Sequence, residues 1–122
     1  MATLVDEEFH ARLAALGQKF AATVPVTLDK IARALAACEA SFPPDASQLD
    51  VLHELLHGVA GSAGTFGFGE LGQQCRRVEQ MVRVVISAHP VPAAEWAPVA
   101  QEVKRLLAWA AIDPRAPWPE AH

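Results

Sequence analysis

The chain has 122 residues, a length that suits one domain with a single hydrophobic core. Apolar residues make up 52% of it, but much of this is alanine, tyrosine is absent and β-branched runs are few, so the composition favours helices over sheet. The formal net charge is −4 and no basic cluster occurs, which argues against nucleic acid or an anionic membrane as a partner.

The N-terminal stretch MATLVDEEFHARL has acidic residues where a signal peptide needs basic ones, and it contains no long apolar run. No other segment reaches the roughly 20 consecutive apolar residues of a membrane span. We therefore expect a cytoplasmic protein.

The first predicted helix covers residues 6–23. Apolar residues recur at helical spacing from Phe9 to Val24, and acidic residues stand where the dipole of a helix start favours them. The same apolar phase continues past Pro25 to Cys38, although proline removes a backbone donor and crowds the preceding turn. We therefore expect either a kink near Val24 or an additional N-terminal helix.

The middle of the chain predicts two helices joined by a glycine turn. Two prolines end the preceding helix, and the hydroxyl of Ser47 can cap a helix over residues 48–66. The glycines at 67 and 69 mark the turn, and a core stripe beginning at Leu71 predicts a helix that ends near Ser87.

The last predicted helix runs to about Ala111, with Pro92 in its first turn. Residues 1–112 then form the domain, and residues 113–122 form a proline-rich tail. Short connections between amphipathic helices predict an all-α fold, an antiparallel up-down four-helix bundle. Its expected core is Phe9, Leu13, Leu16, Phe20, Ile31, Leu35, Leu52, Leu56, Val59, Phe66, Leu71, Val78, Val82, Val103 and Leu107.

The sequence HELLH at residues 53–57 places two histidines one helical turn apart. Advancing by about 100° per residue from His57 puts the apolar stripe of this helix on the opposite side. A histidine inside a core is usually hydrogen-bonded there, but this phase turns His57 away from the core. The residues that share its side are Asp50, His53, Glu54, Ala60, Gly61 and Gly64.

Three glycines, Gly58, Gly61 and Gly64, interrupt the same helix. Each interior glycine costs about 0.5–1 kcal/mol relative to alanine. They either let two helices of the bundle pack closely or keep the surface near His57 open to a partner. Because Gly61 and Gly64 lie on the histidine's side, we favour an open surface.

The stretch LLHGVAGSAGTFGFGELGQQCRRVE resembles the signature of histidine phosphotransfer (HPt) domains. In that family the histidine is followed by an apolar residue at the second position, a glycine at the fourth, small residues, and an apolar residue with glycine at the ninth and tenth. Counted from His57, these positions hold Val59, Gly61, Ser62, Ala63, Phe66 and Gly67.

The resemblance continues onto the next helix, where Leu71, Cys75 and Glu79 match the family and Arg83 matches a basic residue often found there. One position departs from it. The family usually has lysine three residues after the histidine, beside the phosphoryl group, and here that residue is Ala60.

The resemblance implies that His57 is the phosphoacceptor, supported by Gly61, Glu79 and Arg83. Glu79 is a candidate to accept a hydrogen bond from the other ring nitrogen of His57 and to fix its tautomer. Arg83, Arg76 or solvent would replace the missing lysine. The partner-binding surface is expected to comprise His53, Glu54, Gly58, Ala60, Gly64 and Arg76.

The implied function is a relay of phosphate between aspartates of receiver domains. The expected partners are response-regulator receiver domains, a hybrid sensor kinase, or both, and the protein itself is expected to be a monomer. No glycine loop followed by lysine is present to bind ATP, so we expect a phosphotransfer intermediate and not an autonomous kinase. It needs no metal or cofactor of its own, because the receiver domain supplies Mg²⁺.

Two alternatives stay open. HELLH matches the zinc-hydrolase rule of two ligands with Glu54 as general base, but Ala60 and Ala63 stand where the extended pattern needs glycine and a third histidine. The second alternative is a degenerate, non-catalytic helical docking module.

Overall fold

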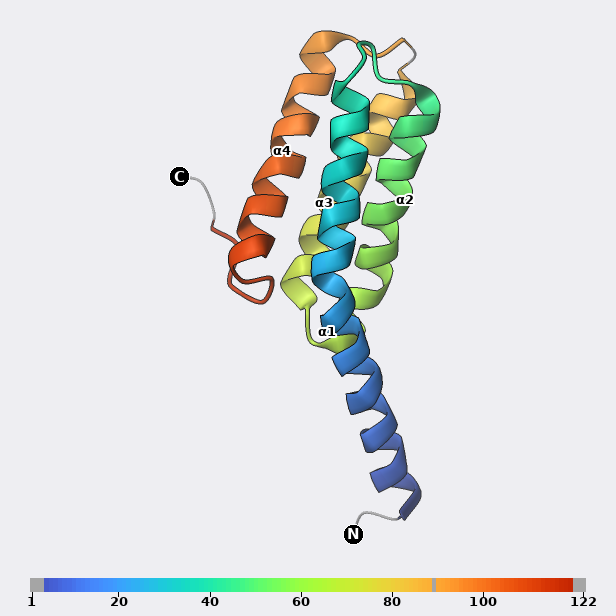
Figure 1. Ribbon diagram of the computed structural model, residues 1–122, viewed down its shortest axis with the longest axis vertical. Helices are drawn as coiled ribbons and strands as arrows, with labels where there is room; N and C mark the ends of the chain where they lie inside the picture. The colour runs from blue at the N-terminus through green and yellow to red at the C-terminus, as the bar shows by residue number, and fades with distance from the viewer. Residues whose placement is uncertain (1–3, 89, 120–122) are drawn as a thin grey trace.

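The computed structural model describes residues 4–88 and 90–119, in which successive helices run in alternating directions (Figure 1). Each helix packs against the next one in the chain, and the last packs against the first, so the predicted all-α, up-down four-helix bundle is confirmed. None of the described helices is long and apolar enough to cross a membrane. The elements are α1 (Leu4–Glu39), α2 (Ala46–Ser62), the 3-10 turn η1 (Ala63–Phe66), α3 (Gly69–Ser87) and α4 (Ala93–Ile112).

The two N-terminal segments predicted from the sequence form a single helix, α1, over the described residues Leu4–Glu39. The helix continues through Pro25, which has no N–H to donate. An interior proline costs about 3 kcal/mol. Val24 and Ile31, on either side of it, are buried, and each such side chain stabilises the fold by about 1.5–3 kcal/mol, which offsets that cost.

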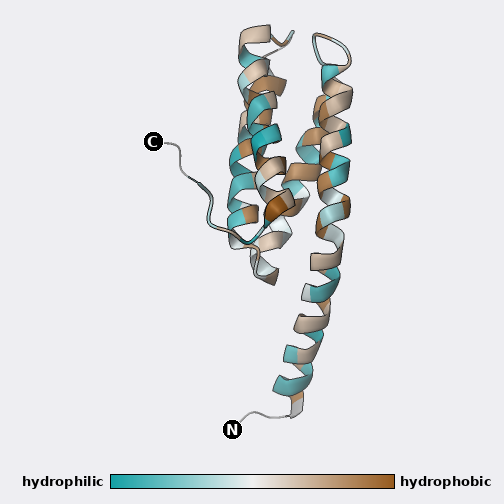
Figure 2. Ribbon diagram, turned by 60° about the vertical axis from the view of Figure 1, so that its left-hand side comes forward, coloured by the Kyte–Doolittle hydropathy of each residue, from teal (hydrophilic) through white to brown (hydrophobic). Residues whose placement is uncertain are grey.

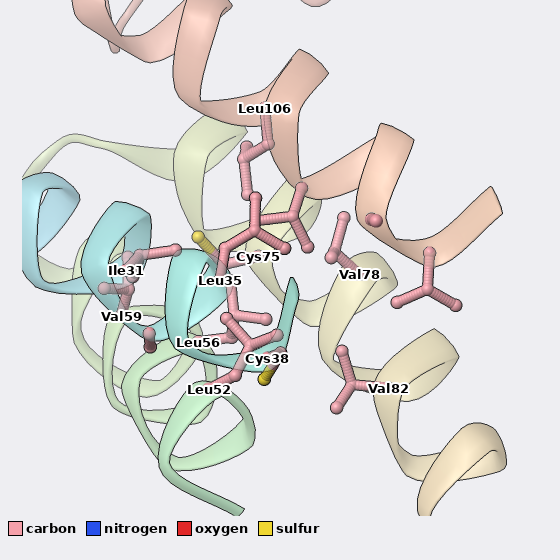
Figure 3. Packing of buried hydrophobic residues seen from close by; sticks show 14 of the residues in the cluster. Ile31, Leu35, Cys38, Leu52, Leu56, Val59, Cys75, Val78, Val82 and Leu106 are labelled. Atoms are coloured by element: carbon pink, nitrogen blue, oxygen red, sulfur yellow. The ribbon is translucent and has the colours of Figure 1, made fainter. Parts of the chain in front are cut away.

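Most of the predicted core residues are buried where the helices face one another (Figure 3). The buried set also contains Leu49, which the expected core omitted, and Cys38 and Cys75, which are free thiols. Phe20 and Phe66 are only partly buried, at the edge of the core. The correctly predicted buried residues are Ile31, Leu35, Leu52, Leu56, Val59, Leu71, Val78, Val82 and Val103.

Three of the predicted core residues are exposed, and Leu107 is partly buried like Phe20 and Phe66. Phe9, Leu13 and Leu16 are 61%, 38% and 51% exposed, because this part of α1 projects beyond the other helices (Figure 1). In α4, Leu106 is fully buried and its neighbour Leu107 is only partly so. The periodicity identified the apolar side of each helix, but not which part of that side the other helices bury.

The start and end of α2 differ from the prediction. Asp45 caps the helix, because its Oδ1 accepts a hydrogen bond from the backbone N–H of Ser47 at 3.1 Å, so the prediction of Ser47 as the cap was wrong. The last turn of the predicted helix, up to Phe66, is the tighter η1. Gly67 follows with φ of 85°, a left-handed conformation that favours glycine. This reversal brings α3 back alongside α2.

The described part of the C-terminal tail lies against α4. The ring of Trp118 meets that of Trp109 edge-on, with 5.2 Å between centroids, and the guanidinium of Arg105 lies 4.7 Å from the Trp118 ring centroid. Arg105 also donates a hydrogen bond to the carbonyl of Pro119 at 2.7 Å. The outermost residues of the predicted domain and tail, 1–3 and 120–122, lie outside the described residues.

Candidate functional site

His57 on α2 and Glu79 on α3 meet where these two helices pack side by side. The Nδ1 atom of His57 lies 2.9 Å from Oε1 of Glu79, within hydrogen-bonding distance. The histidine side chain is 60% exposed, whereas that of the glutamate is only 7% exposed. Because Nδ1 pairs with the buried carboxylate of Glu79, Nε2 is the ring nitrogen left available for chemistry.

Glu79 is held in its ionised form. Burial disfavours the charge and acts to raise the pKa of Glu79, but the hydrogen bond from His57 and the electrostatic attraction of His57, His53 and Arg83 outweigh burial and lower the pKa. An ionised carboxylate can only accept hydrogen bonds, so Nδ1 of His57 must carry the proton. This tautomer leaves a lone pair on Nε2, the atom that faces outward.

His53 lies beneath His57 and does not form part of the open surface. Its side chain is 15% exposed, and its ring stacks on that of His57 with 5.9 Å between centroids. Its Nε2 is 3.1 Å from the same Oε1 of Glu79, but the contact is too poorly directed for a hydrogen bond, so it is mainly electrostatic. His53 therefore contacts the carboxylate that supports His57.

A hollow opens beside His57 between α2 and α3. Its floor includes Ala60 and Gly61 from α2, and its α3 side consists of Arg76, Glu79, Gln80 and Arg83. Arg83 Nη2 lies 3.4 Å from Oε1 of Glu79, and Arg76 Nη2 makes a long contact of 3.5 Å with the carbonyl oxygen of Ala60. Both arginines thus line the α3 side of the hollow that His57 borders.

The glycines of α2 and η1 leave open space on this side of the bundle. A Cβ added at Gly58, Gly61 or Gly64 would meet no side chain or neighbouring element within 4 Å, so these glycines do not serve helix packing. Gly72 on α3 does. A Cβ there would lie in van der Waals contact, 3.4 Å from Cβ of Ala63 and 3.5 Å from the backbone N of Gly64, so α3 packs against η1 here with no room for a larger side chain.

Comparison with known protein families gives a match over most of the chain. A family model described as Hpt domain matches residues 15–109. The chain belongs to the Hpt domain family. The family resemblance inferred from the sequence is thereby confirmed, and the family implies histidine phosphotransfer in two-component signalling, with receiver domains and sensor kinases as the usual partners. No curated protein and no solved structure matches the chain.

The matched part of this Hpt domain contains the whole hollow, which brings together most of the residues predicted for the site. His57, Ala60, Gly61, Arg76, Glu79 and Arg83 all line it. Gly64 lines a second, neighbouring hollow together with Gly72.

Glu54 is exposed, as its place on the His57 side of the helix predicted, but it lies outside the hollow, whereas Gln80 lies in the hollow. The Glu54 side chain is 77% exposed. Its Oε1 lies 3.9 Å from Nδ1 of His53. Gln80 lines the hollow but was not predicted. Its helical spacing from Arg76 and Arg83, four and three residues away, was the signal that could have identified it.

The geometry of this Hpt domain gives little support to the zinc alternative. A zinc hydrolase needs its glutamate beside the metal as general base, whereas Glu54 points into solvent. Within residues 4–88 and 90–119, no group of three or more histidine, cysteine, aspartate or glutamate side chains is arranged to hold a metal ion.

Proposed function

We propose that His57 is the phosphoacceptor of this Hpt domain, and that it relays a phosphoryl group between aspartates of receiver domains. The observation that supports this most strongly is the pairing of an exposed imidazole with a buried carboxylate, 2.9 Å from Nδ1 to Oε1 of Glu79. A neutral imidazole with one oriented nitrogen and one free nitrogen is what nucleophilic attack on phosphorus requires.

In the forward step the lone pair of Nε2 attacks the phosphorus of an aspartyl phosphate. The N–P bond forms as the P–O bond breaks, and the aspartate leaves as a carboxylate. The proton on Nδ1 stays in place, so the phosphorylated ring acquires positive charge. The ionised carboxylate of Glu79 stabilises that charge at short range.

In the second step the aspartate of another receiver attacks the phosphorus. The N–P bond breaks, and its electron pair returns to Nε2 of His57. The chain acts as an intermediate and not as an autonomous kinase, with the receiver or a hybrid sensor kinase as its partner and the receiver supplying Mg²⁺. We assign this exchange to the cytoplasm.

Two arginines take the place of the usual lysine in this proposal. Ala60 offers no charge, but the guanidinium groups of Arg76 and Arg83 border the same hollow as His57. Guanidinium groups bind phosphate oxygens readily, and both side chains line the hollow into which a phosphoryl group on His57 would project. They would stabilise its negative charge together with the Mg²⁺ of the receiver.

The open glycine surface supplies the docking site for the receiver. Gly61 lines the hollow directly, and no other part of the described chain occupies the space above it. A receiver must bring its aspartate within bonding distance of Nε2, so its backbone has to approach α2 closely. Side chains at the glycine positions would prevent that approach.

The test is transfer from a receiver domain that carries labelled phosphate on its aspartate, in the presence of Mg²⁺. We expect one phosphate on the protein that is labile in acid and stable in base, absent in His57→Gln and retained in His53→Ala. A protein that binds the receiver but gains no label, in the wild type and in Ala60→Lys, would favour the degenerate docking module instead.

A further inference from the structure

The first part of α1 carries an apolar stripe that no other described element covers. Val5, Phe9, Leu13 and Leu16 are 72%, 61%, 38% and 51% exposed. At about 100° per residue they lie on the same side of the helix as Ile31, which the bundle buries completely. Figures 1 and 2 show this part of the helix extending past the ends of the other three. A contiguous exposed stripe of this kind marks an interaction surface.

Coverage of the stripe ends at Phe20. Its ring packs against those of Phe66 and Phe68, with 5.3 and 5.4 Å between centroids. Beyond this aromatic cluster the remaining turns of α1 have no neighbouring helix (Figure 2). The core stripe of α1 is therefore longer than the bundle that covers it.

The charges beside the stripe indicate what covers it. Glu8, Arg12 and Lys19 lie along one flank, with the acid near the start of the helix and the bases further on. In an antiparallel pair of these helices, Glu8 of one copy would face Lys19 of the other, whereas a parallel pair would bring the acidic starts together.

We propose that a second copy of this chain covers the stripe, and that residues 4–20 of the two α1 helices pair in antiparallel orientation about a two-fold axis near Leu13. In this register Phe9 packs against Leu16 of the second copy, and the contact occurs twice by symmetry. Lys19 reaches Glu8 of the second copy. The expected oligomeric state changes from a monomer to a dimer.

The existing structure lowers the cost of this pairing. The segment spans about 25 Å and is already helical as the continuation of a helix anchored in the bundle, so pairing need not order it. The internal ion pair that Arg12 makes with Glu8 is long, at 3.8 Å, and highly exposed, so it does not hinder rearrangement.

The dimer is independent of the proposed phosphotransfer. Val5, Phe9 and Leu13 lie outside the part of the chain that matches the family model, residues 15–109. The hollow at His57 lies between α2 and α3, away from the projecting part of α1. Pairing therefore leaves His57 of each copy accessible. Either proposal can fail without the other.

Sedimentation equilibrium of the full chain over a wide concentration range tests the pairing. We expect the wild type to have the mass of a dimer at tens of micromolar, and Leu13→Glu to weaken association by at least about tenfold, since a charge would be buried in the interface. Val51→Glu is the matched control, because Val51 is 53% exposed on α2, away from the stripe. Circular dichroism at a concentration low enough for both variants to be monomeric should show the same melting transition in each.

The charges test the orientation. Lys19→Glu should weaken the dimer, and adding Glu8→Lys in the same chain should restore it, because each antiparallel contact then has its charges exchanged. A wild type that stays monomeric at several hundred micromolar would overturn the proposal, as would a dimer that survives Leu13→Glu. A monomer whose Leu13→Glu variant loses receiver binding would show that the receiver covers the stripe instead.

Discussion

The imidazole rings of His53 and His57 lie nearly parallel, 14° apart, and both face the same oxygen of Glu79. Their exposure separates their roles, because the His57 side chain is 60% exposed and that of His53 only 15%. His57 can meet a partner, whereas His53 can act only through Glu79. The helical pattern of HELLH alone does not separate them, because it places both histidines on the same side of the helix.

Replacing Glu79 by glutamine tests the role of its charge. Glutamine keeps a carbonyl oxygen that can accept from Nδ1 of His57, but it cannot balance the positive charge of the phosphorylated ring. We expect Glu79→Gln to slow phosphorylation about tenfold, which corresponds to roughly 1.4 kcal/mol of transition-state stabilisation. Single-turnover transfer from a phosphorylated receiver measures this rate. A variant as fast as the wild type would show that the carboxylate charge contributes nothing.

The same substitution has a pH signature in stability. Because the folded protein lowers the pKa of Glu79 below its ordinary value of 4.5, the ionised carboxylate stabilises the fold above that value. This contribution is lost as the pH falls through the lowered pKa. Urea unfolding should therefore show the wild type more stable than Glu79→Gln at neutral pH, with a difference that shrinks in acid. A difference that grew in acid would contradict the assigned direction.

Gly61→Gln should block phosphotransfer and leave the melting temperature unchanged or slightly higher. Its added side chain meets no atom of the fold within 4 Å at Cβ, and glutamine favours a helix more than glycine does. Gly72→Leu is the contrasting variant, because its side chain would press on α2 and should cost about 1–3 kcal/mol of stability. Thermal melts and transfer assays on both proteins separate access from packing. Unfolding of Gly61→Gln would show that this glycine serves packing.

A lysine at position 60 should be able to replace the positive charge of an arginine beside the hollow. Arg76→Gln should slow phosphorylation or shorten the life of phosphohistidine, since it removes a cation from the hollow. Ala60→Lys should speed transfer in the wild type and rescue Arg76→Gln, by returning a cation to within about 6 Å of the phosphate. Quantifying labelled protein over time follows both steps. If the lysine rescues nothing, cations at this position are irrelevant to the reaction.

The helices and their apolar sides were predictable because periodicity depends only on local spacing. Ile31, Leu52 and Val78 were correctly assigned to the core from their phase. Phe9 and Leu16 have the same kind of phase but lie exposed, because coverage depends on how far the other helices reach. Sequence spacing contains no information about that length.

The site was predictable to the extent that it lies on one side of one helix. The outward direction of His57 followed from its phase, and its partner Glu79 from the family resemblance. The inward position of His53 did not, because it lies near the edge of the polar side, where the placement of α3 decides its exposure. Gly72 was missed because close packing depends on the facing helix, here at Ala63.

The most direct test of the central claim is to identify the atom that bears the phosphate. Nitrogen-15 NMR of the phosphorylated protein, with labelled histidine, distinguishes the two ring nitrogens by their coupling to phosphorus. The account predicts a single phosphorylated residue, His57, with phosphorus on Nε2 and a proton retained on Nδ1, which faces Glu79. Phosphorus on Nδ1 of His57, or on His53, would contradict it.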